Sequence, residues 1–330
     1  MSRAWFTFVS IAVMAALSHT ARAQDPPAAS AQGYPARPVR VTIGFAPGGG
    51  VDILARVVAQ RLTEQLGRPF VVENRAGAGG TTAYAMVAKS PPDGYTLLAV
   101  SGSYAISSAL YSSLPYDPIK DFAPITLMGA APFLVVVHPS LPVKSIGDLI
   151  ALARAKPGML DFASGGYGSS GHLTGEMFKA MARVQMTYIP YKGGDLALID
   201  LVGGQIHVVF SNILSSLPHV KTGRARAIAV TSTTRSSILP HVPTIAESGV
   251  PGYEAVNWYG WLAPAGTPAA IVNRLNAGIG EIVKTAEMRE RLARDGAEPA
   301  WSTPAQFSRH LAADIARWRK VISDAKVRVE

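Results

Sequence analysis

Apolar positions along the chain follow two patterns that alternate. Short runs rich in β-branched residues, such as 39–45 and 96–101, predict strands, while longer segments with apolar residues at helical spacing, such as 51–66 and 172–182, predict amphipathic helices. Strands that alternate with helices are typical of an α/β fold with mostly parallel sheets flanked by helices. Further strands are predicted at 70–73, 122–128, 133–138, 160–164, 186–190, 206–211, 225–232 and 257–263, and further helices at 81–89, 145–155, 196–202, 214–222, 268–284, 286–295 and 303–321.

This order of elements divides into two α/β units. The first covers 34–132, the second covers 133–255, and the tail from 256 to 330 is expected to pack back onto the first. We therefore expect a two-lobed molecule, with 34–132 plus 256–330 forming lobe 1 and 133–255 forming lobe 2. Two chain crossings between the lobes would leave a ligand cleft at the carboxyl ends of the two sheets, where open α/β sheets bind their ligands.

The N-terminus has the three parts of a secretory signal peptide. Arg3 supplies the positive charge, 5–17 is an apolar run, and Ala21-Arg22-Ala23 is a small-x-small cleavage pattern. The run is shorter than the roughly 20 residues that span a membrane. We predict a signal peptide over 1–23 that is cleaved after Ala23, a disordered leader over 24–33, and a soluble exported protein. The alternative is an unstructured apolar N-terminus.

Composition and charge narrow the function classes. The chain has no cysteine, which excludes disulfides, thiolate metal sites and a cysteine nucleophile. It has 31 Lys and Arg against 22 Asp and Glu, and loss of Arg3 and Arg22 with the signal peptide leaves 29 and 22, a net charge of +7. Because the basic residues are scattered, a surface that favours small anionic solutes explains this charge better than nucleic-acid binding does.

The segment 45–52 joins a predicted strand to a predicted helix through three glycines. Backbone N–H groups at such a turn converge on one point, and the helix N-terminus adds partial positive charge. The segment therefore predicts an anion-binding loop, in which Asp52 could accept hydrogen bonds from loop amides or from a ligand ammonium. The alternative is an ordinary strand–helix turn.

A second glycine-rich loop, 163–172, also follows a strand and opens a helix. It contains a literal GxGxxG, but the acidic residue that a dinucleotide site needs about 20 residues later is missing, since Tyr191 stands there. A second anion-binding loop with Ser169 and Ser170 at the helix start fits better. The alternative is a glycine-rich turn capped by serines.

A third loop, 191–195, offers Lys192 as a partner for a carboxylate and Tyr191 as a pocket wall, although a solvated lysine and a packed tyrosine are equally consistent with the pattern. No GxSxG, HExxH or P-loop motif is present. We therefore expect no catalytic residue, no metal and no cofactor. The one Ser/His cluster places His172 beside Ser169 and Ser170.

These motifs, taken together, resemble a known family across nearly the whole mature chain. The chain is similar to the extracytoplasmic solute receptors of the tripartite tricarboxylate transporter system, the Bug receptors. The segments that carry the resemblance are Phe45-Ala46-Pro47-Gly48-Gly49 with Asp52, Glu73-Asn74-Arg75-Ala76-Gly77, Pro92-Asp93-Gly94-Tyr95, Tyr116-Asp117-Pro118, Tyr191-Lys192-Gly193, Asp200-Leu201-Val202-Gly203-Gly204-Gln205 and Trp258-Tyr259-Gly260.

The resemblance implies a two-lobed periplasmic binding protein of type II-like architecture, which is not an enzyme. It implies a small organic acid as ligand, with its carboxylate held between the two glycine loops, partly through bridging waters. The chain departs from the family over 101–108, where Tyr104 could shape the pocket. The resulting ligand-binding candidates are Phe45, Ala46, Gly48, Gly49, Asp52, Ser101, Ser103, Gly165, Ser169, Ser170, His172, Tyr191 and Lys192.

The leading hypothesis is a monomeric receptor that closes on a di- or tricarboxylate, an amino acid or an aromatic carboxylate and delivers it to membrane transporter subunits, with no nucleic acid involved. One alternative is a ligand sensor that docks on a two-component kinase. The other is a periplasmic hydrolase that uses Ser169 or Ser170 with His172.

Overall fold

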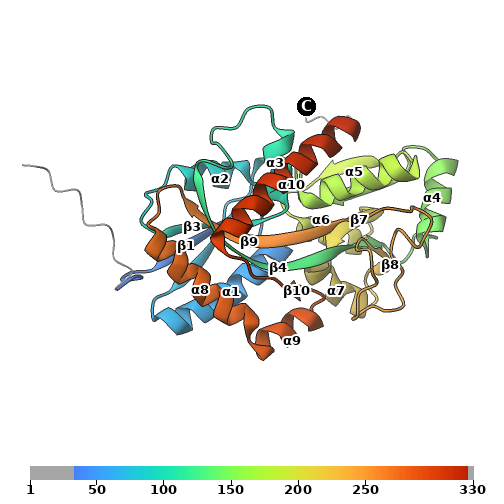
Figure 1. Ribbon diagram of the computed structural model, residues 1–330. Coiled ribbons are helices and arrows are strands. Elements are labelled where there is room, and N and C mark those ends of the chain that lie inside the picture. Colours follow the sequence, from blue (N-terminus) through green and yellow to red (C-terminus); the bar gives the residue numbers. More distant parts are fainter. Residues whose placement is uncertain (1–32, 326–330) are drawn as a thin grey trace, which may run out of the picture.

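The computed structural model describes residues 33–325 and forms two α/β lobes that lie side by side (Figure 1). The predicted signal peptide, its cleavage after Ala23 and almost all of the predicted leader lie outside the described residues. Within 33–325, no helix combines the length and the apolar character that crossing a membrane requires.

The first lobe is built on three parallel strands. β1 (Val39–Ile43) lies between β2 (Phe70–Asn74) and β3 (Thr96–Ser101) and pairs with both, and four of its five residues are buried. Helices connect and cover these strands. They are α1 (Gly50–Leu66), the short turn η1 (Ala78–Gly80) with α2 (Thr81–Ala88), and α3 (Ser103–Leu110).

Two long strands run between the lobes in the middle of Figure 1. β4 (Phe122–Val137) is one continuous strand where the pattern predicts two, and β9 (Val256–Pro264) lies antiparallel between it and β3. β4 pairs with β9 up to Pro132, and from Phe133 onward it pairs with strands of the second lobe. The pairing partner of β4 therefore changes between these two residues.

The second lobe repeats the parallel arrangement. β5 (Asp161–Ser164) lies between β6 (Thr187–Pro190) and β7 (Val208–Asn212), and β7 and β8 (Arg226–Val230) pair with β4. Its helices are α4 (Ile146–Ala155), α5 (Ser170–Ala182), α6 (Gly194–Val202) and α7 (Ile213–Lys221). The sheets are thus mixed: the strands joined by helical crossovers are parallel, and β4 and β9, which carry the chain between lobes, add the antiparallel pairs.

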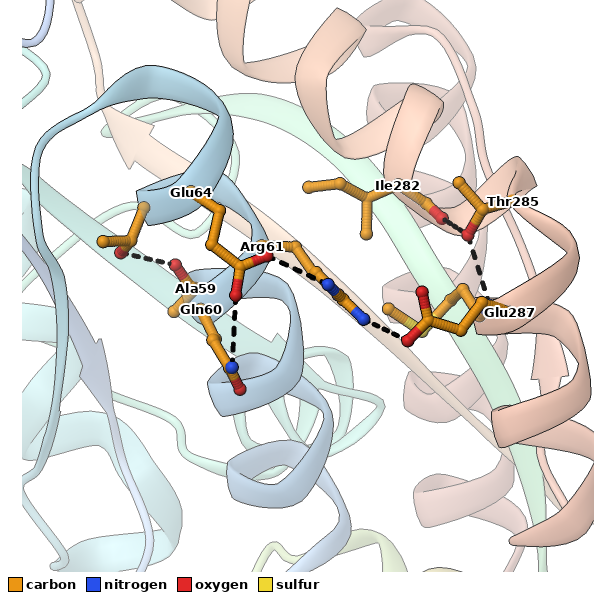
Figure 2. A network of polar contacts seen from close by, with 9 residues as sticks. Ala59, Gln60, Arg61, Glu64, Ile282, Thr285 and Glu287 are labelled. Carbon is orange, nitrogen blue, oxygen red and sulfur yellow. Dashed lines mark hydrogen bonds and ion pairs between the residues drawn. The ribbon is translucent and has the colours of Figure 1, made fainter.

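The C-terminal segment comprises α8 (Ala269–Lys284), α9 (Ala286–Arg294), the short β10 (Glu298–Pro299) and α10 (Pro304–Ala325). In it, α8 packs against α1, and α10 packs against α3. Figure 2 shows how α1 and α9 are joined, through an Arg61 guanidinium that pairs with both Glu64 and Glu287. A hydrogen bond also joins β9 to α10, in which the Trp258 indole N–H donates to the Asp314 carboxylate over 2.8 Å.

Tyr104 belongs to the core and not to the ligand site, which corrects the expectation that it shapes the pocket. Its ring is fully buried in an aromatic cluster with Tyr84, Tyr116 and Phe122, and its hydroxyl donates to the Pro118 carbonyl over 2.7 Å. The reason is that 103–110 forms the helix α3, which the pattern analysis did not predict, and the tyrosine lies on the core-facing side of that helix.

Candidate functional site

A cavity lies between the lobes where the first turns of five helices meet. α1, α3, α5, α6 and α7 each contribute residues from their N-terminal turn to its wall. It offers about 70 Å³ of space for the centres of water molecules, and because one water needs about 10–15 Å³, the cavity suits a ligand of a few heavy atoms. Its lining residues are Phe45, Ala46, Gly49, Gly50, Val51, Ser101, Ser103, Phe133, Ser164, Gly165, Ser169, Ser170, Gly171, Gly194, Asp195, Phe210, Ser211, Asn212, Ser215 and Asn257.

The loop before α1 delivers backbone amides to this cavity. Gly49 caps the helix in an extended conformation, so the amides of Gly50 and Val51 open the first turn, where no carbonyl of the helix can accept from them. A Cβ on Gly50 would lie 2.5 Å from the Tyr259 hydroxyl, so only glycine fits. Gly48, at φ +93, provides the left-handed turn that brings the loop to the helix.

Asp52 shapes this loop from behind and does not line the cavity. Its carboxylate is buried, accepts from the Gly48 amide over 3.0 Å and from the Asn74 side chain over 2.9 Å, and pairs with Arg56 over 2.9 Å. Burial alone would raise the pKa of Asp52, but the hydrogen bonds from Arg56, Gly48 and Asn74 outweigh it and lower the pKa. The carboxylate is therefore ionised and already satisfied by protein groups.

The second glycine loop places the start of α5 on the opposite wall. Ser169 is the N-cap, and its Oγ accepts from the His172 amide over 3.2 Å and shares a hydrogen bond of 3.0 Å with Ser164. Ser170 and Gly171 follow at the cavity surface, and Gly165 packs against Gly194 of α6. This wall thus offers both hydroxyls and first-turn amides.

His172 lies behind the second loop and outside the cavity lining. Its ring is buried against Tyr188, with centroids 4.2 Å apart, and Nδ1 accepts from the Gly168 amide over 3.4 Å. Burial, helped by the positive charge of Lys179, lowers its pKa to about 3, so the ring is neutral near pH 7. Among the described residues the imidazole bonds neither serine hydroxyl, so the geometry does not assemble the Ser/His pair that a hydrolase would need.

Direct hydrogen bonds join the lobes around the cavity. The Ser170 amide donates to the Ser103 hydroxyl over 2.9 Å, and the Ser170 hydroxyl donates to Asn257 of β9 over 3.1 Å. On another side, the Ala46 amide donates to the Lys192 carbonyl over 3.2 Å. In the described conformation the two lobes therefore contact each other directly, and the cavity lies between them.

Tyr191 and Lys192 line a neighbouring hollow that shares Phe45 and Gly165 with the cavity. The Tyr191 hydroxyl donates to Asp200 over 2.6 Å, and burial together with this hydrogen bond raises the pKa of the phenol to about 12. The Lys192 side chain is exposed.

The structure brings most of the other candidates together. The cavity wall contains Phe45, Ala46, Gly49, Ser101, Ser103, Gly165, Ser169 and Ser170. Three candidates lie outside the wall and support it, namely Gly48, Asp52 and His172.

Sequence reasoning missed the cavity residues on α6, α7 and β9. Asn212 caps α7 and accepts from the Leu214 amide over 3.1 Å, and Asp195 lies in the first turn of α6. An Asn or Asp at the junction between a predicted strand and a predicted helix is a signal that could have found both. Asn257 has no such local signal, because it reaches the cavity only through the pairing of β9 with β3.

The only side-chain charge in the described cavity wall is negative. Among the residues that the structure describes, Asp195 is the only ionisable side chain in this wall, and no lysine, arginine or histidine lines it. Within residues 33–325, no group of three His, Asp or Glu side chains is placed to hold a metal ion. An anion in this cavity would therefore be held by first-turn amides, hydroxyls and the amide side chains of Asn212 and Asn257.

Comparison with known proteins gives one consistent result. The model of the tripartite tricarboxylate transporter family receptor matches residues 54–327. Protein BugT of Bordetella pertussis is 39% identical over 303 residues, which cover 91% of this chain and 93% of that protein. The solved structure of R. palustris Rpa4515 with adipate is 41% identical at a TM-score of 0.87, covering 89% of this chain and 99% of that one. MatC from Rhodopseudomonas palustris with bound malate is 32% identical at a TM-score of 0.83, covering 88% and 100%.

Proposed function

The chain belongs to the tripartite tricarboxylate transporter receptor family, and from this premise we propose that it binds a small organic carboxylate in the cavity between its lobes. Members of this family are periplasmic solute-binding receptors. The proposal extends that general role to a specific mode of capture and to delivery of the ligand to the membrane subunits of a tripartite tricarboxylate-type transporter.

The observation that carries the proposal is that, in the described part of the chain, five helix N-termini converge on one cavity whose wall has no cationic side chain. Each N-terminus contributes partial positive charge and N–H groups that have no acceptor in their own helix. Together they can neutralise a carboxylate without burying an unpaired cation when the site is empty. The solved relatives with adipate and malate hold ligands of this chemical class.

Closure of the lobes is the proposed mechanism of capture. We assign residues 34–132 and 256–330 to lobe 1 and 133–255 to lobe 2, and the change of pairing partner on β4 between Pro132 and Phe133 supports this boundary. Because both lobes line the cavity, a bound carboxylate contacts both and favours the closed state over the open one. In this proposal the closed, ligand-bound monomer is the form that docks on the transporter.

The experiment is a titration of the mature chain, from Gln24 onward, with matched pairs of ligands. Each pair consists of a mono-, di- or tricarboxylate or an amino acid and its primary amide, which has the same shape without the negative charge. We expect carboxylates to raise the thermal unfolding midpoint and amides to leave it unchanged, since a ligand at 100 times its Kd adds about 2.7 kcal/mol of stability. Equal binding of acids and amides would refute capture by the helix N-termini.

A further inference from the structure

Asp195 is an unusual residue for a cavity that binds anions. It lies in the first turn of α6 and, within residues 33–325, is the only ionisable side chain in the cavity wall. Its Oδ1 atom is buried and has no hydrogen-bond partner, in a wall where the surrounding serine and asparagine side chains are hydrogen-bonded to one another. One acceptor in the cavity wall is therefore left without a hydrogen-bond partner.

The surroundings of Asp195 supply no cation. Across the cleft the Asp195 carboxylate faces the loop that contains Gly48. A Cβ atom placed on Gly48 would lie 3.3 Å from Oδ2 of Asp195. Behind that loop is the negative Asp52, whose charge is already paired with Arg56. The pKa of the Asp195 carboxyl is raised, chiefly by burial and also by the negative charge of Asp52. Hydrogen bonds from the amides of Asp195 and Leu196 oppose this rise. No Lys, Arg or His forms an ion pair with Asp195 in residues 33–325.

A ligand that is only an anion would place a second negative charge beside this carboxylate. A ligand that carries an ammonium group next to its carboxylate would satisfy both the amides and Asp195. Its carboxylate would accept hydrogen bonds from the first-turn amides, and its ammonium would donate to the Asp195 carboxylate. The hydroxyl of a hydroxy acid could donate to Oδ1, but it would leave the two negative charges unbalanced.

We propose that the ligand of this cavity is a small amino acid in its zwitterionic form and that the Asp195 carboxylate selects it by binding its ammonium group. This inference rests on the proposed function, because it names the substrate class of the same cavity. The space of about 70 Å³ agrees with a compact zwitterion of this kind.

The test compares probes that differ only in the group beside the carboxylate. Calorimetric titrations use L-alanine, L-lactate and propionate as one series, and L-glutamate with glutarate as a second. For the wild-type protein we expect the amino acid to bind roughly tenfold tighter, or more, than the acids of its series. Asp195→Asn keeps the size of the side chain and removes its charge, so it should abolish this preference. Asp200→Asn, on the same helix but outside the cavity wall, is the matched control and should retain it.

The outcomes separate this inference from the function on which it rests. Wild-type protein that binds glutarate or lactate as tightly as the amino acid would overturn the role of Asp195 and leave carboxylate capture standing. Glutarate affinity that rises at acidic pH, and that Asp195→Asn reproduces at neutral pH, would also overturn it, because Asp195 would then act as a neutral donor. Failure of every carboxylate probe to bind would contradict the proposed function itself.

Discussion

The buried His172 predicts a specific loss of stability in acid. Its ring lies beside Tyr188 with almost no exposure to solvent, and the nearby Lys179 is already paired with Glu176. Burial lowers the pKa of the folded state to about 3 from an ordinary value of 6.5. Between these values the unfolded chain binds a proton that the folded protein does not bind, so folding stability falls as the pH drops from 6.5 towards 3.

The magnitude follows from the difference between the two pKa values. Each pH unit within the window costs about 1.4 kcal/mol, so at pH 4.5 the wild-type protein should have lost about 3 kcal/mol through His172 alone. A His172→Asn variant cannot bind this proton. Replacing the ring leaves space beside Tyr188 and lowers stability, but by a similar amount at every pH.

The assay is urea unfolding of wild type and His172→Asn at pH 7.5 and pH 4.5. The loss of unfolding free energy between the two conditions should be smaller in the variant by about 3 kcal/mol. The partly buried His310 and His219, whose pKa values are also lowered, are present in both proteins and cancel in the comparison. Equal losses in the two proteins would refute the argument that a neutral, buried His172 supports the second loop.

Two further substitutions test the packing that positions the cavity. Gly50→Ala would place a Cβ 2.5 Å from the Tyr259 hydroxyl, so we expect a loss of ligand affinity in calorimetry of roughly tenfold or more; unchanged affinity would show that the loop can move aside. Trp258→Phe removes the indole N–H that donates to the buried Asp314, so urea unfolding should show a loss of about 1–3 kcal/mol with ligand affinity unchanged; wild-type stability would mean that this hydrogen bond does not anchor α10.

Much of the architecture could be predicted because most helices and strands follow from the apolar pattern of their own short segment of sequence. The alternation of apolar patterns identified both lobes' parallel strands and the glycine loops that precede α1 and α5. Where the local pattern was broken, the prediction failed. Gly129 and Pro132 fall between the strands predicted at 122–128 and 133–138. In β4 they lie at a register shift and at the change of pairing partner, where a continuous strand tolerates them.

The rest of the site could not be predicted because it depends on contacts between distant segments. α3 has a serine-rich sequence with weak helix propensity, and its packing against α10 and the aromatic core stabilises it. Asn257 meets Gly102, whose amide donates to it over 3.0 Å, only because β9 pairs with β3 in one register. The position of Asp52 behind the loop, rather than in the cavity, likewise follows from its bonds to Asn74 on β2.

Ser215 is the position at which capture of a carboxylate by helix N-termini can be tested with a single added charge. This serine lines the cavity from the first turn of α7, where an acidic residue is compatible with the helix and does not threaten folding. Ser215→Asp adds a negative charge to the cavity, and Ser215→Asn adds a side chain of the same size without charge. At about 6 Å and an effective dielectric constant of about 20, the added charge should cost a bound carboxylate about 3 kcal/mol, or roughly 100-fold in affinity.

The measurement is calorimetric titration of both variants with a carboxylate that the wild-type protein binds. We expect Ser215→Asp to bind about two orders of magnitude more weakly than Ser215→Asn, while both variants unfold at similar urea concentrations. Equal affinities in the two variants would contradict this expectation, because a carboxylate held among these helix N-termini could not be indifferent to a negative charge on the same wall.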